Sequence, residues 1–145
     1  MAATPPYRMP KALRVTTKSL ASVLWLSGCV WLALHYLFPA HTQFGPAPNP
    51  WEATVIRIHG LTAIAGVYWL GWITARHVLD GWRQNKNHRS GIAMVILAAV
   101  LSLSGYALYY TTGDTQRAGF SIVHEVIGAF AIVAALVHWA GKKGR

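Results

Sequence analysis

Four long apolar segments constrain the fold of this chain more than any other feature. Residues 19–38, 58–75 and 90–113 contain no charged side chain, and residues 118–141 contain only Glu125. Each segment is close to the ~20 residues that an α-helix needs to cross about 30 Å of hydrocarbon. The apolar runs are continuous and do not alternate with polar residues, as membrane strands would. The pattern predicts an all-α integral membrane protein, a four-helix bundle.

The basic residues predict how these helices are oriented. Of the thirteen Lys and Arg residues, all but Arg57 and Arg117 precede the first segment, separate the second from the third, or follow the fourth. The positive-inside rule therefore places both termini in the cytoplasm. The chain divides into a basic cytoplasmic N-terminal arm (1–18), a four-helix transmembrane domain (19–141) and a basic cytoplasmic tail (142–145). Anionic membrane lipids are the expected partners of the arm.

Several classes of function are excluded by the same sequence. The net charge of +9 comes from basic residues grouped outside the apolar segments, as is typical of a membrane protein, so it does not indicate nucleic-acid binding. The single cysteine, Cys29, excludes an internal disulfide and a cysteine-based metal site. Residues 19–38 have no small-residue cleavage site before Pro39, so we interpret them as a retained helix and not as a cleaved leader. No nucleophilic triad or nucleotide-binding glycine loop is present, and no catalytic residue is assigned.

The histidines give the strongest indication of function. The second and fourth segments run in the same direction, and each has a histidine near both ends: His59 and His77, then His124 and His138. The spacings of eighteen and fourteen residues put the two imidazoles of each helix on nearly one face, about 27 Å and 21 Å apart along the axis. Each membrane face therefore receives one histidine from each helix. Helix tilt or a local distortion must absorb the mismatch of about 6 Å.

Facing imidazoles in a bundle core suit a haem iron with two axial histidines. No Cys-x-x-Cys-His sequence occurs, so the haem would be b-type. We expect two haems, the outer bound by His59 and His124 and the inner by His77 and His138. His35, near the outer end of the first segment, is an alternative outer ligand, or lines a quinone pocket, or faces the interface. Small residues would let the macrocycle enter: Gly28, Gly60, Gly66, Gly91, Gly105 and Gly128.

The remaining charged residues are assigned to supporting roles. Arg57 and Arg117 near the outer site and Arg76 near the inner one could pair with haem propionates, or with lipid headgroups. Glu125 follows His124 but points about 100° away from it, towards another helix, an aqueous pocket or a partner. Cys29 is interpreted as core packing, and His41 and His88 are left without a role.

Four stretches of the chain carry a resemblance to a known family: RIHGLTAIAGVYWLGWITARHVLDGW (57–82), HRSG (88–91), LSGYALYY (103–110) and HEVIGAFAIVAALVHW (124–139). Over about residues 19–141 the chain resembles small bacterial four-helix membrane proteins of the cytochrome b type. The last stretch is also similar to the cytochrome b subunits of formate dehydrogenases and nickel–iron hydrogenases. That similarity implies that His124 and His138 each ligate one of two haems. The spacing between His59 and His77 is wider than the fourteen residues of respiratory cytochrome b.

Together these features predict a subunit of the bacterial inner membrane that carries electrons across the bilayer between two bis-histidine haems. It would link a periplasmic redox protein, or a larger oxidoreductase subunit, with the quinone pool. Its short loops leave no room for a catalytic domain, so it would not be a catalyst by itself. Two alternatives stay open: a haem-free anchor or assembly subunit, and proton or metal-ion transport. Transport would need the proton or metal ion to be relayed across an uncharged gap of about 17 Å or more.

Overall fold

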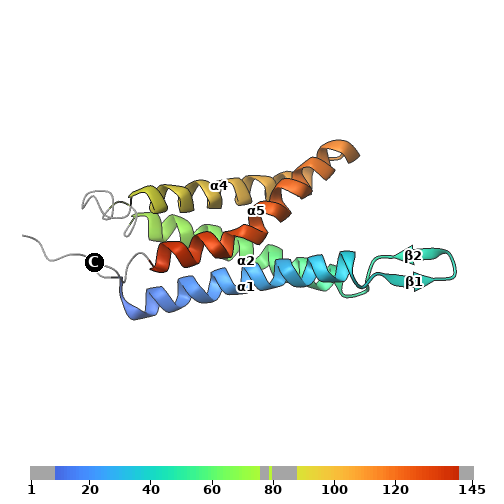
Figure 1. The fold of residues 1–145 in the computed structure, drawn as a ribbon, viewed down its shortest axis with the longest axis horizontal. Coiled ribbons are helices and arrows are strands. Elements are labelled where there is room, and N and C mark those ends of the chain that lie inside the picture. Colours follow the sequence, from blue (N-terminus) through green and yellow to red (C-terminus); the bar gives the residue numbers. More distant parts are fainter. Residues whose placement is uncertain (1–8, 76–78, 80–87, 141–145) are drawn as a thin grey trace, which may run out of the picture.

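The computed structural model describes residues 9–75, 79 and 88–140, which form long helices and one short β-hairpin (Figure 1). The helices are α1 (Lys11–Tyr36), α2 (Glu52–Ile73), α4 (His88–Tyr110) and α5 (Asp114–Ala140). All four are long and apolar enough to cross a membrane. The prediction of an all-α fold with four candidate membrane-spanning helices is therefore confirmed.

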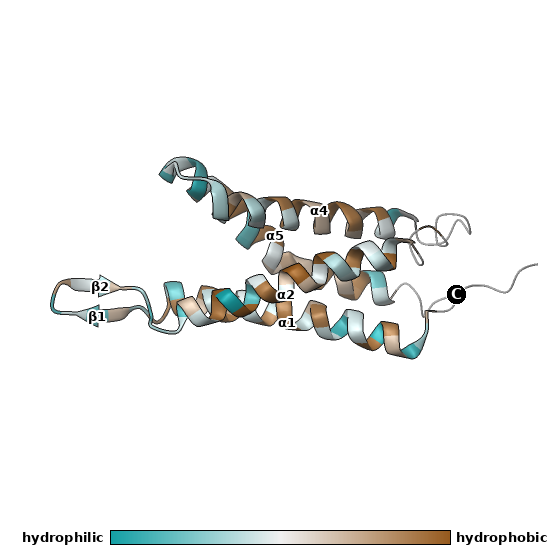
Figure 2. Ribbon diagram, turned by 180° about the vertical axis from the view of Figure 1, so that it is seen from behind, coloured by the Kyte–Doolittle hydropathy of each residue, from teal (hydrophilic) through white to brown (hydrophobic). Residues whose placement is uncertain are grey.

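The helices are arranged as two antiparallel pairs. Helix α1 packs along α2, α4 packs along α5, and the pairs meet mainly where α1 contacts α5. The start of α1 and the end of α5 lie at one end of the molecule, which we call the terminal end. The β-hairpin and the α4–α5 turn lie at the other, which we call the hairpin end. Towards the hairpin end the two pairs diverge, as both Figure 1 and Figure 2 show.

The helix bounds differ from the apolar segments for local reasons. Helix α1 begins at Lys11, so residues 11–18 of the predicted N-terminal arm are helical. Long basic side chains tolerate this position because their stems cover apolar surface while their charges reach polar headgroups. The same helix ends at Tyr36, since Pro39 disfavours a helical conformation for the residue before it. Helix α5 begins at Asp114, where an acidic side chain in the first turn interacts favourably with the helix dipole.

The segment between α1 and α2 is not an irregular loop throughout. Strands β1 (Ala40–Thr42) and β2 (Gly45–Ala47) pair in antiparallel fashion, with Thr42 opposite Gly45. Gly45 has a φ of 108°, a conformation that side chains with a Cβ rarely adopt. The hydroxyl of Thr42 donates to the carbonyl oxygen of Gly45 at 3.0 Å and closes the turn. The hairpin projects beyond α1 and α2 (Figure 1). Phe44, in the turn between its strands, is 91% exposed.

Few side chains in the described part of the chain are buried by the protein itself. They are Glu52, Ile73, Ser104 and Ala135. Apolar residues cover most of the helix length, most evidently on α4 (Figure 2). In a bilayer such surfaces contact lipid, which is as apolar as a protein core. Two of the four buried residues are polar, and both belong to the contacts described next.

Candidate functional site

The structure brings two of the predicted ligands face to face. His59 on α2 and His124 on α5 have ring centroids 6.2 Å apart, and their planes meet at 85°. Both side chains are half-buried. The two residues belong to different helix pairs, so this contact spans the space between the pairs. The predicted outer pair is thus one structural unit in the hairpin-end half of the bundle.

Each of these histidines is held by a serine on the antiparallel helix that it packs against. The Oγ atom of Ser27 on α1 lies 2.9 Å from Nδ1 of His59. The Oγ atom of Ser104 on α4 lies 2.9 Å from Nδ1 of His124. Ser104 is only 5% exposed, so water does not compete for that bond. With Nδ1 engaged, Nε2 is the ring nitrogen left to act as a ligand.

A glycine follows each serine and lets the imidazole approach the helix. A Cβ atom added to Gly28 would lie 3.4 Å from Cε1 of His59, and one added to Gly105 would lie 3.2 Å from Cε1 of His124. Ser27 and Gly28, like Ser104 and Gly105, end a shared Leu-x-Leu-Ser-Gly sequence, at 24–28 and 101–105. The two helix pairs therefore supply equivalent halves of one site.

The serines were missed by the sequence analysis, although this repeat was visible. A serine in a membrane helix ordinarily bonds its own helix backbone, so a single one has no special meaning. Only the recurrence of the same five-residue pattern, opposite a histidine each time, would have indicated a role.

A similar contact lies at the terminal end. The Nδ1 atom of His138 on α5 is 3.1 Å from Oγ of Ser90 on α4. Ser90 and Ser104 are fourteen residues apart, as are His124 and His138, so α4 and α5 repeat the serine–histidine contact at two levels about 21 Å apart. The proposed partner of His138, His77, and the proposed propionate ligand Arg76 lie outside the described residues.

His35, the alternative outer ligand, has other partners in this structure. Its Nδ1 atom lies 3.1 Å from Oε2 of Glu52. Its ring stacks on Trp31 with centroids 4.7 Å apart and planes inclined by 12°. These contacts hold His35 at the α1–α2 junction, whereas His59 faces His124 directly. The geometry favours His59 over His35 as the partner of His124.

In the part of the chain that it describes, the structure gives the other predicted residues no contact that indicates a role in binding a haem. Arg57 and Arg117 are both exposed, and among the described residues no ion pair involves either of them. Of the predicted small residues, Gly60 approaches the hydroxyl of Tyr109, whose oxygen would lie 2.8 Å from an added Cβ. Gly66 and Gly128 pack against Leu24 and Leu101, whereas Gly91 borders open space. Cys29 is half-buried.

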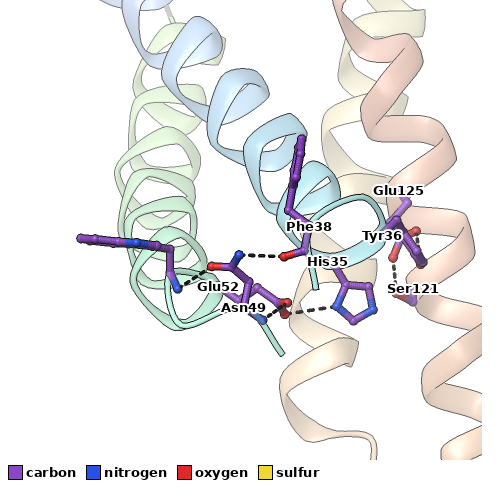
Figure 3. Close-up of polar contacts among 8 residues, drawn as sticks. His35, Tyr36, Phe38, Asn49, Glu52, Ser121 and Glu125 are labelled. Carbon is purple, nitrogen blue, oxygen red and sulfur yellow. Dashed lines mark hydrogen bonds and ion pairs between the residues drawn. The ribbon is translucent and has the colours of Figure 1, made fainter. Parts of the chain in front are cut away.

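A polar network closes the hairpin end of the bundle (Figure 3). The carboxylate of Glu52 accepts the backbone N–H of Asn49 at 2.9 Å and contacts His35 through its second oxygen. The Asn49 side chain donates to the carbonyl oxygen of Phe38 at 2.7 Å. These bonds tie the end of α1 to the start of α2.

Glu125 belongs to the same end of the molecule and faces α1. The Tyr36 hydroxyl donates to its Oε2 atom at 3.2 Å, and the Ser121 hydroxyl donates to Oε1 at 2.5 Å (Figure 3). Of the three directions left open by the sequence, the structure therefore supports contact with another helix. This carboxylate links the two helix pairs beside His124.

Replacing Glu52 by alanine is expected to destabilise the hairpin end. Glu52 is only 9% exposed, and its loss leaves Asn49 and His35 without an acceptor. Unsatisfied groups of this kind cost about 1–3 kcal/mol each. Thermal unfolding in detergent would measure the change, with Thr54→Ala, at an exposed position in the same turn of α2, as the matched control. Equal unfolding temperatures for both variants would show that the network does not stabilise the fold.

Comparisons of the chain with protein-family models, with curated proteins and with solved structures give no match. Within the described ranges, no three His, Cys, Asp or Glu side chains are grouped so that they could hold a metal ion. The candidate site is therefore a two-histidine site, and its chemistry has to be argued from its geometry.

Proposed function

We propose that the chain is a membrane cytochrome that holds a haem b between His59 and His124. The observation that carries this proposal is the 6.2 Å separation of the two ring centroids. A transition-metal ion binds an imidazole nitrogen at about 2.0–2.1 Å, and that nitrogen lies about 1.1 Å from the ring centre, so two imidazoles on opposite sides of one ion have centroids about 6.3 Å apart. The two rings thus have the spacing of axial ligands.

The surroundings of the pair fit a haem better than a bare metal ion. Haem iron takes four ligands from the macrocycle, so two protein ligands complete it. Both Nδ1 atoms are hydrogen-bonded to serines, and a metal-binding histidine usually has its second ring nitrogen hydrogen-bonded to a polar group. The helix pairs that supply the two halves meet mainly through α1 and α5 and bury few side chains. Such loose packing suits two halves that close on a flat cofactor.

A second haem at the terminal end is part of the proposal. It rests on His138, which repeats the serine contact of His124, and on His77 as its partner. Haem supplies reversible one-electron chemistry when bound, while the chain's own residues bind it and exclude water. Two haems about 21 Å apart along α5 would carry electrons from one membrane face to the other. Arg57 and Arg117 at the hairpin end and Arg76 at the terminal end would pair with the propionates.

The wider setting follows from the same reasoning. Both termini are cytoplasmic and the hairpin end is periplasmic, in a bacterial inner membrane. The protein is an electron-transfer subunit that links a periplasmic redox protein or larger oxidoreductase subunit with the quinone pool. The resemblance to small cytochrome b-type proteins supports this assignment, and so does the placement of the basic residues.

An absorption spectrum of the purified protein tests the proposal. We expect b-type bands in the reduced-minus-oxidised spectrum and two haems per chain. One haem per chain would remove the terminal-end site from the proposal. Protein expressed with ample haem that showed no such bands would contradict it and favour the haem-free anchor.

A further inference from the structure

We infer that Ser27 and Ser104 are a matched pair of positioning residues, which hold His59 and His124 in one tautomer and fix their ring planes at right angles. The consequences for the iron rest on the proposed haem site. The tautomer itself is a property of the protein alone and can be tested without haem.

The tautomer follows from counting the hydrogens on each serine. A serine hydroxyl has one hydrogen to donate and two lone pairs that accept. The hydroxyl of Ser27 is directed to the carbonyl oxygen of Leu24 at 3.0 Å. The hydroxyl of Ser104 is directed to the carbonyl oxygen of Val100 at 2.7 Å. Because a carbonyl oxygen only accepts, each serine has already used its hydrogen.

Each serine oxygen can therefore only accept from the histidine that it contacts. The Nδ1 atoms of His59 and His124 must be the donors, and each lies 2.9 Å from its serine oxygen. In a neutral imidazole with a proton on Nδ1, Nε2 carries the lone pair. The opposite tautomer would set two lone pairs against each other, or would force the serine to release its helix carbonyl.

The ring planes are fixed by two contacts for each ring. One edge is bonded to the serine, and Cε1 rests against the glycine that follows it, Gly28 or Gly105. The two half-sites lie on different helix pairs, and their imidazole planes meet at 85°. Neither ring can turn out of its plane without losing its serine.

Two properties of a bound haem would depend on this arrangement. Perpendicular imidazoles donate into different iron d orbitals and leave these nearly equal in energy, so the ferric haem should give a strongly anisotropic low-spin EPR signal. A hydrogen bond from Nδ1 also makes Nε2 more basic, which stabilises ferric iron and lowers the midpoint potential. The serines would thus set both the signal and the potential of the hairpin-end haem.

Removing each hydroxyl tests the inference in the haem-loaded protein. We expect Ser27→Ala and Ser104→Ala to raise the midpoint potential of one haem and to change its EPR signal, with haem content retained. Ser27→Thr and Ser104→Thr should keep both readouts at their wild-type values, because a threonine hydroxyl in a helix can donate to the carbonyl three or four residues before it. In this chain Thr16, Thr17, Thr62 and Thr74 all donate to the carbonyl four residues before them. The controls are Ser22→Ala on α1 and Ser102→Ala on α4, both exposed.

Nitrogen NMR of the haem-free, full-length protein labelled in its histidines provides the second measurement. We expect a single Nδ1–H form for His59 and His124, and a mixture of tautomers for His59 in Ser27→Ala and for His124 in Ser104→Ala. Unchanged tautomers in both variants would overturn the inference, and so would unchanged potential and EPR signal in haem-loaded variants. If an alanine variant loses its haem, the tautomer that NMR measures in that variant decides whether the serine holds the histidine. A wild-type protein that binds no haem would contradict the proposed function but would leave the tautomer test intact.

Discussion

Substituting His124 by alanine is expected to remove the hairpin-end haem and to leave the terminal-end haem in place. An axial imidazole cannot be replaced by a methyl group, and the facing ring of His59 alone cannot hold a low-spin iron. The haem-to-protein ratio should fall to about half, and a redox titration should lose one of two transitions. His59→Ala should give the same result, because under the proposal both rings bind one iron.

Two histidines that the structure places elsewhere are matched controls. His41→Ala changes an exposed residue of strand β1, and His35→Ala changes the partner of Glu52. Both variants should keep two haems. A full two-haem spectrum in His124→Ala would show that the ligand assignment is wrong. Loss of the hairpin-end haem in His35→Ala, with normal content in His59→Ala, would make His35 the ligand.

The membrane-spanning helices could be predicted because the bilayer imposes their length and composition directly. Their bounds could not, because local bonds decide where a helix begins. Helix α2 starts at Glu52, six residues before its uncharged segment, where Glu52 bonds back to Asn49. The β-hairpin was also missed, since its proline-rich sequence is typical of loops. A single glycine, Gly45, supplies the turn that lets its two short strands pair.

Part of the candidate site could also be predicted. The helical period put the two histidines of each helix on nearly one face, and the structure brings His59 of α2 and His124 of α5 together. The helical repeat does not reveal which polar groups hold those rings, because this depends on the depth at which α1 packs against α2 and α4 against α5. The same limit applied to His35, whose partner Glu52 follows it by seventeen residues and a hairpin.

Leucine in place of Gly105 is expected to expel the hairpin-end haem without unfolding the bundle. A Cβ at this position already lies 3.2 Å from Cε1 of His124, so a branched side chain must occupy the space of the ring. The imidazole cannot shift freely, because its Nδ1 is held by Ser104 at 2.9 Å. Haem content should fall to about half, while circular dichroism should show unchanged helix content.

Gly119→Leu is the matched control, because nothing lies within 4 Å of a Cβ added to that exposed position on α5. Gly28→Leu should reproduce the effect from the other helix pair, since a Cβ there would lie 3.4 Å from Cε1 of His59. The two leucine variants at Gly28 and Gly105 test different halves of one site, and the proposal requires both to lose the same haem. If Gly105→Leu kept two haems with unaltered potentials, the ring of His124 would not rest against α4 in the haem-bound protein, and the equivalence of the two half-sites would fail.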